Sequence, residues 1–114
     1  MRKPEEILVD TELAGHLKKA QEVYVAVVDT KEAHTRLLEE WNQARLAQKA
    51  DIDRIASGDE RPDMLVLLRK STARLNRLED ALSTSERARS AAADAYTKAS
   101  GEVWKRMTEY LPSY

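Results

Sequence analysis

Apolar side chains recur with a seven-residue repeat in two long stretches of this chain, residues 11–56 and 62–111. Such a repeat is typical of long helices that pack against one another along a stripe. Two rows of each stretch are expected to face the other helix. In the first stretch, one row holds Leu13, Ala20, Val27, His34, Trp41, Gln48 and Ile55, and the other holds Leu17, Tyr24, Lys31, Leu38, Arg45 and Ile52.

The second stretch repeats the pattern, with smaller side chains in its C-terminal half. Its rows are Leu68, Leu75, Leu82, Arg89, Tyr96, Val103 and Tyr110, and Met64, Ser71, Leu78, Ser85, Ala92, Ala99 and Arg106. Pro112 is expected to stop this helix at about Leu111. A short helix is predicted at residues 4–9, with Asp10 or Thr11 as the N-cap of the long helix that follows.

Residues 57–61, between the two stretches, form the predicted turn. Gly58 can take the left-handed backbone conformation that closes a helix, and Pro62 suits the first turn of a new one. We therefore predict an all-α fold: one domain, residues 1–114, built as a long antiparallel helical hairpin of the coiled-coil type. Helix 1 is expected at about residues 11–56 and helix 2 at about residues 62–111.

Polar side chains interrupt the seam between the two predicted helices. A reversal at residue 59 or 60 brings Tyr24 level with Tyr96, and it also gathers a polar cluster of Lys31, His34, Ser85 and Arg89. A buried cluster of mixed charge can form a reactive site, because low dielectric shifts pKa values. Polar residues at seam positions also fix the alignment of coiled coils, and we interpret this cluster in that way.

At two places, Val23–Val28 and Met64–Leu68, the predicted helices are apolar all round. A hairpin buries only one stripe of each helix, so this pattern indicates a further buried face and hence another chain. The predicted interface residues are Val23, Val25, Val28, Leu65, Val66 and Leu67. We expect a homodimer in which residues 23–28 of one chain lie on residues 64–68 of the other, as an antiparallel four-helix bundle.

Composition narrows the function classes. The 114 residues have a net charge of −1 and no cysteine, which excludes disulfides and thiolate chemistry. No apolar run reaches the ~18 residues that span a bilayer, and the N-terminus lacks the apolar core of a secretory signal. We expect a cytoplasmic protein, or one exported without such a signal. Two carboxylates and an imidazole, from Glu12, Glu102 and His16, could bind a divalent metal, but we interpret these side chains as surface residues. With no phosphate loop, catalytic triad or zinc spacing, we predict no enzyme, cofactor, metal or small-molecule substrate.

Charge is distributed unevenly along the chain. Residues 10–60 carry eleven acidic and seven basic side chains, whereas residues 61–89 carry four acidic and seven basic ones. A basic patch near the start of the second helix offers contacts to phosphates: Arg69, Lys70, Arg74 and Arg77. No aromatic residue is interleaved for base stacking, and the patch equally complements the acidic first helix. A nucleic-acid-associated hairpin is therefore a second alternative.

In size and layout the chain resembles the WXG100 (ESAT-6-like) secreted proteins, which are small, cysteine-free helical hairpins that pair into four-helix bundles. This resemblance implies a secreted hairpin as the first alternative. The chain departs from the motifs of that family. Its turn reads Ser57-Gly58-Asp59 in place of Trp-x-Gly, its tryptophans are Trp41 and Trp104, and no Tyr-x-x-x-Asp/Glu signal follows the second helix.

The apolar surplus favours a non-enzymatic protein–protein interaction or structural module. We expect an oligomeric helical hairpin that serves as an adaptor, an inhibitor, or a structural protein of a phage or other mobile element. The expected partners are a second copy of the chain and another protein. We do not expect a membrane or nucleic acid as the main partner.

Overall fold

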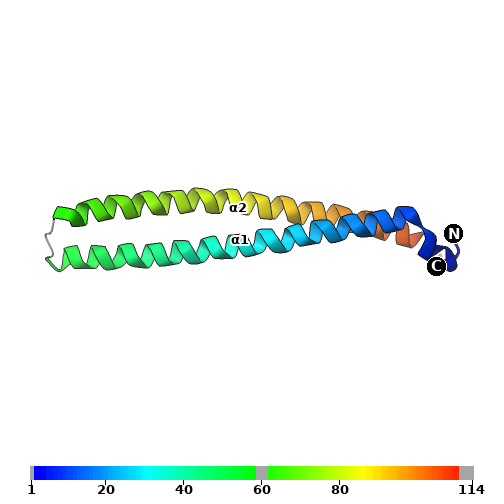
Figure 1. Cartoon of the computed structure of the whole chain (residues 1–114), viewed down its shortest axis with the longest axis horizontal. Helices are drawn as coiled ribbons and strands as arrows, with labels where there is room; N and C mark the ends of the chain where they lie inside the picture. The colour runs from blue at the N-terminus through cyan, green and yellow to red at the C-terminus, as the bar shows by residue number, and fades with distance from the viewer. Residues whose placement is uncertain (1, 59–61, 111–114) are drawn as a thin grey trace. The chain divides into compact units, whose positions relative to one another are not determined.

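The computed structural model describes residues 2–58 and 62–110, and every regular element in these ranges is helical (Figure 1). A short 3₁₀ helix, η1, spans Pro4–Val9, and two long helices follow, α1 at Thr11–Ala56 and α2 at Pro62–Thr108. The predicted all-α helical hairpin is confirmed. α1 has the predicted bounds, whereas α2 ends three residues before Leu111, which lies outside the described residues.

The early end of α2 has a local cause. The amides of Glu109 and Tyr110 bond to the carbonyls of Arg106 and Met107, three residues back, at 3.2 and 3.0 Å. Such bonds tighten the last turn of a helix and close it. The carbonyl of Glu109 then accepts a hydrogen bond from the amide of Arg2 at 2.7 Å. The chain thus leaves the helix before it reaches Pro112.

Both ends of α1 follow the sequence signals. Asp10 has extended backbone angles, φ −75° and ψ 98°, so η1 and α1 are separate helices. Its carboxylate accepts a hydrogen bond from the amide of Leu13 at 3.0 Å, which makes Asp10 the N-cap. At the other end Gly58 has φ +98°, the positive value expected of a helix-closing glycine. The rest of the predicted turn, residues 59–61, lies outside the described residues.

The contacts within the chain divide it into two units. The terminal unit comprises residues 1–31 and 88–114, and the turn unit comprises residues 32–87. In each unit a part of α1 runs antiparallel to a part of α2, in the predicted register. The rings of Tyr24 and Tyr96 are 5.6 Å apart in the terminal unit. In the turn unit, His34 lies 3.1 Å from Ser85. That the two units form one domain stays a prediction.

One of the two predicted seam rows of α1 is wrong by one residue. The row from Leu13 to Ile55 faces α2 as expected. The second inward row, however, is buried or half-buried and consists of His16, Val23, Thr30, Leu37, Ala44 and Asp51. The predicted row holds exposed side chains instead, among them Leu17, Leu38, Ile52 and Tyr24, which is 53 % exposed. Adjacent residues differ by about 100° around a helix, and α2 covers the smaller side chains rather than the larger ones.

In α2 both predicted rows face α1 along most of their length. Met64, Leu78 and Ala99 are buried, and most other members are half-buried. Arg89 and Tyr96 are the exceptions, because both are exposed. Tyr96 leans out of the seam onto the exposed ring of Tyr24, and the two rings meet at a tilt of 54°.

Candidate interaction surfaces

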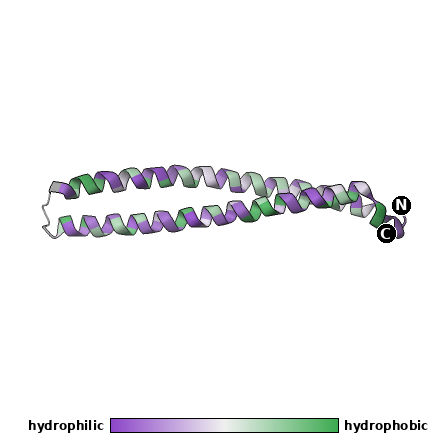
Figure 2. Cartoon of the chain, in the orientation of Figure 1, coloured by the Kyte–Doolittle hydropathy of each residue, from purple (hydrophilic) through white to green (hydrophobic). Residues whose placement is uncertain are grey.

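The start of α2, in the turn unit, carries exposed apolar side chains on several sides, and Figure 2 shows it as a hydrophobic end beside the turn. Met64 is buried there with 2 % exposure. The predicted interface residues Leu65, Val66 and Leu67 are all exposed, Leu65 by 62 %. A helix that is apolar all round therefore has only one side covered at this point, as the sequence indicates. That another chain covers the rest stays a prediction.

In the terminal unit, the structure separates the predicted interface residues. Val25 and Val28 are exposed, whereas Val23 is half-buried in the seam row of α1. The sequence interpretation missed two larger exposed side chains on this unit, Leu17 and Tyr24, because it placed both in the seam. It also missed Trp104, which is 65 % exposed. A signal was present only for Trp104, which directly follows Val103, a member of a predicted inward row, and so lies outside that row.

Two members of the predicted polar cluster, His34 and Ser85, meet within the turn unit. In the turn unit, His34 Nδ1 lies 3.1 Å from Ser85 Oγ, and His34 Nε2 lies 3.4 Å from a carboxylate oxygen of Glu86. The His34 side chain is only 13 % exposed, so this is a layer of the seam. Lys31 and Arg89 belong to the terminal unit and are exposed.

A second polar layer lies nearer the turn. The side-chain amide of Gln48 donates hydrogen bonds to Ser71 Oγ at 3.1 Å and to Thr72 Oγ1 at 2.8 Å. The Ser71 hydroxyl in turn donates to the carbonyl of Leu68 at 2.9 Å. Gln48 and Ser71 both belong to predicted seam rows, and the predicted reversal sets them level with each other, although the sequence interpretation did not name them as a layer. Each layer joins α1 to α2 through groups that need a partner of matching geometry.

The basic patch divides between two hollows of α2. Lys70, Arg74 and Arg77 line one shallow hollow together with Asp51 and Leu67. Arg69 lines another, and its neighbours there are all uncharged: Leu65, Leu68, Thr72, Ala73 and Asn76. The Asp51 carboxylate therefore accompanies three of the four cations.

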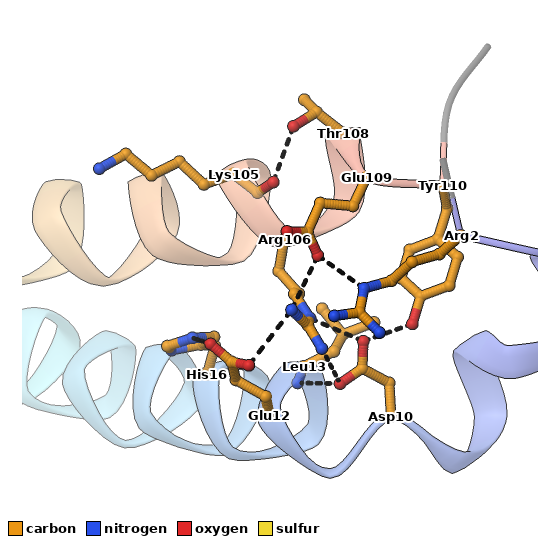
Figure 3. Close-up of polar contacts among 10 residues, drawn as sticks. All are labelled: Arg2, Asp10, Glu12, Leu13, His16, Lys105, Arg106, Thr108, Glu109 and Tyr110. Carbon is orange, nitrogen blue, oxygen red and sulfur yellow. Dashed lines mark hydrogen bonds and ion pairs between the residues drawn. The ribbon is translucent and has the colours of Figure 1, made fainter.

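The densest polar network of the described residues lies in the terminal unit (Figure 3). The Arg106 guanidinium grips the Asp10 carboxylate with two hydrogen bonds, from Nε at 2.8 Å and from Nη2 at 3.1 Å. The Tyr110 hydroxyl donates a short hydrogen bond to the same carboxylate. Arg106 Nη1 also lies 2.8 Å from Glu109 and 3.2 Å from Glu12. These contacts fasten the start of α1 to the end of α2.

The hydrogen bonds of this network favour the ionised forms of Asp10 and Arg106. Hydrogen bonds from Arg106, Tyr110 and the Leu13 amide hold the pKa of Asp10 well below its usual range. The bond to Asp10 raises the pKa of Arg106, and burial, followed by the bond to Asp10, raises the pKa of Tyr110. A carboxylate saturated with donors is a poor proton acceptor. The sequence indicated Asp10 as a cap and Arg106 and Tyr110 as inward residues, and the predicted reversal sets Asp10 level with Tyr110, but the sequence interpretation did not join the three.

Neither a metal-binding cluster nor a membrane-spanning helix occurs in the described ranges, 2–58 and 62–110. They contain no group of three or more His, Asp or Glu side chains that could hold a metal ion. His16 Nε2 lies 3.7 Å from Glu12 Oε1, and the other carboxylate oxygen of Glu12 forms an ion pair with Arg106. Among the described residues, no helix has the length and hydrophobicity that crossing a membrane requires.

No protein-family model matches the chain, and no characterised protein or solved structure is significantly similar to it.

Proposed function

We propose that this chain is a non-enzymatic protein–protein interaction module, an oligomeric helical hairpin that acts as an adaptor, an inhibitor, or a structural protein of a phage or other mobile element. The observation that carries the proposal is the exposed apolar surface on each unit. At the start of α2, Leu65, Val66 and Leu67 are consecutive and exposed. Large apolar surfaces on monomeric proteins usually mark sites of interaction.

The thin core supports the same proposal. The buried hydrophobic residues are few among the described residues: Leu13, Ala44, Met64, Leu78, Ala99 and Tyr110. Fully burying a Val or Leu side chain is worth roughly 1.5–3 kcal/mol. A partner that covers the half-exposed side chains of one such patch therefore adds several kcal/mol to a small fold. For a fold with so small a core, oligomerisation is a common source of stability.

Nucleic-acid binding has weaker support. Three of the four cations line one hollow, but the Asp51 carboxylate lines it too. A phosphate backbone is best met by a continuous basic surface, and its binding weakens steeply with added salt.

Mass in solution tests the proposal directly. The full chain is expected to sediment as a dimer at micromolar concentration, and Leu67→Asp should weaken that dimer because it places a charge on an exposed apolar patch. Glu40→Ala is the matched control, since it changes the charge of an exposed helical position outside the predicted interface. A wild-type chain that stays monomeric up to about 100 times that concentration would overturn the proposed self-association.

A further inference from the structure

Three cations of α2 stand in a row along one hollow of the turn unit. Lys70, Arg74 and Arg77 are exposed, and they line this hollow together with Leu67. The four residues are spaced by three, four and three positions, so they lie along one side of the helix. We call Leu67, Lys70, Arg74 and Arg77 the basic row. No ion pair joins any of its three cations to another described residue.

The acidic residues of α1 do not balance this charge. The hydrogen bonds from Gln48 to Ser71 and Thr72 set the levels of the two helices, so residues 41–50 of α1 lie level with the three cations. That segment carries Arg45 and Lys49 and no acidic residue. Positive charge from both helices therefore meets at this level.

Nearby carboxylates are few. α2 has no acidic residue from 64 to 78, which is the longest acid-free stretch of the sequence. Asp51 lines the hollow, but its carboxylate lies 3.7 Å from Arg54. The basic row thus offers three cations to an anion from outside the chain.

Leu67 indicates which class of anion fits. Its side chain is 45 % exposed at one end of the basic row, and it adjoins the exposed residues Leu65 and Val66. A protein segment that carries both carboxylates and an apolar side chain gains from the whole row. Arginine also matches a carboxylate with two parallel hydrogen bonds.

Other polyanions fit less well. A phosphate backbone gains little from a leucine, and no aromatic side chain lines the hollow for a base to stack on. The Asp51 carboxylate repels phosphates as well. A lipid surface is broad and contacts protruding side chains best, whereas Leu67 lines a hollow.

A second copy of the chain does not supply the matching acids. Neither α1 nor α2 has three acidic residues at the spacing of the three cations, which is four and three positions in either order. Asp29 and Glu32 begin such a row, but Arg36 stands at its third position. The matching partner is therefore a different protein.

We infer that the basic row binds an acidic helical segment of another protein. A helix lying along α2 has the same rise per residue, so carboxylates three and four positions apart can face Lys70, Arg74 and Arg77 together. An apolar side chain of the same segment covers Leu67. This inference rests on the proposed function, because it states the chemistry of the second protein that the module binds.

Defined peptides test the inference on the full chain. The probes are alanine-based helical peptides with one leucine and three glutamates at the spacing of the basic row, made in both chain directions. Fluorescence anisotropy should show at least one of them binding about tenfold or more tightly than the same peptide with glutamines. Added salt should reduce this advantage, because the ion pairs are exposed.

A charge exchange shows where the peptide binds. Arg74→Glu should weaken binding of the glutamate peptide about fivefold or more. A peptide with lysine in place of its central glutamate should bind this variant more tightly than it binds the wild type. Arg69→Glu is the matched control, since it makes the same change of charge in the other hollow and should alter the dissociation constant less than about twofold at 0.15 M salt. Circular dichroism checks that both variants keep their helical content.

A wild-type chain that binds the glutamate and glutamine peptides equally would overturn the inference. Tighter binding to a DNA duplex, or to vesicles of phosphatidylglycerol, than to the glutamate peptide would also overturn it, because the ligand would then be a nucleic acid or a lipid. Sedimentation separates this inference from the proposed self-association. Arg74→Glu should leave the mass of the dimer unchanged, and loss of the dimer would assign the basic row to a contact between copies instead. A monomeric wild type that prefers the glutamate peptide would overturn self-association alone.

Discussion

The terminal unit and the turn unit use the same two helices, yet they keep their polar groups in different places. In the terminal unit, the Asp10 carboxylate lies at the end of the helix pair, where Arg106, Tyr110 and the Leu13 amide all donate to it. In the turn unit, polar groups lie within the seam itself, at His34 and Gln48. A network at an end can fasten two helices, whereas layers within a seam can also select one alignment.

The difference extends to how well the polar groups are satisfied. The terminal network gives its carboxylate a full set of donors. In the turn unit, the indole N–H of Trp41 is buried without a hydrogen-bond partner among the described residues. Arg45 lies over the ring at 5.3 Å, but it covers the face of the indole rather than its N–H. A buried donor without a partner costs about 1–3 kcal/mol. This cost falls within the seam of the turn unit.

The largest expected effect is loss of core packing, and it should be similar in the two units. Leu13 of the terminal unit and Leu78 of the turn unit are both buried. Leu13→Ala and Leu78→Ala should each lower the free energy of unfolding by about 2 kcal/mol or more, measured by urea denaturation. Leu46→Ala is the control, because Leu46 is exposed. Equal losses for buried and exposed leucines would contradict the observed seam.

The next effect concerns the turn. Gly58 has φ +98°, and no atom lies within 4 Å of the position that a side-chain carbon would take there, so a larger residue meets backbone strain rather than a clash. Gly58→Val should lower the free energy of unfolding by roughly 1 kcal/mol or more. Gly58→Asn should cost less, since asparagine tolerates positive φ better than a β-branched residue. Equal stability of wild type and the valine variant in urea denaturation would show that positive φ is not required there.

Acid should weaken the terminal unit through Asp10. The pKa of Asp10 is lowered in the folded chain from its ordinary value of 3.8, so its ionised form contributes stability above that pH. This contribution is lost as the pH falls below about 3.8 towards the lower folded value, where the carboxylate takes up a proton. The melting temperature should therefore drop between pH 5 and roughly 2.

Asp10→Asn separates this effect from general acid denaturation. The variant should melt at a lower temperature than wild type at pH 7, because it loses the negative charge to which Arg106 and Tyr110 donate hydrogen bonds. Its melting temperature should also fall less on acidification. An equal fall in wild type and variant would mean that other carboxylates account for the acid sensitivity. Glu39→Gln in the turn unit, at an exposed position, is the matched control.

Much of this fold could be predicted from the sequence, because its signals are local. Gly58 and Pro62 mark the ends of the helices, and a single reversal then fixes the level of Tyr24 with Tyr96. The side of α1 that faces α2 could not be predicted in full. The observed inward row is interrupted by His16 and Asp51, and the predicted row by Lys31 and Arg45, so hydrophobicity alone does not distinguish the two. The same reversal sets Asp10 level with Tyr110, but the hydrogen bonds among Asp10, Arg106 and Tyr110 depend on side-chain geometry that no motif in the sequence indicates.

The smallest expected effect tests whether the His34 layer sets alignment. His34→Leu removes the contacts to Ser85 and Glu86 from a seam position that is largely buried. Replacing seam polar groups with apolar ones is often neutral or stabilising, so the free energy of unfolding should stay within about 1 kcal/mol of wild type or rise. The predicted cost is the loss of a single helix alignment. Amide NMR spectra of the variant should therefore show additional resonances from the turn unit, while the resonances of the terminal unit stay single. Leu37→Met, an apolar exchange in the other inward row, is the control and should keep one set of resonances. If His34→Leu instead abolished binding to a partner while the oligomer and the single set of resonances persisted, His34 would be part of a binding site rather than a device that fixes register.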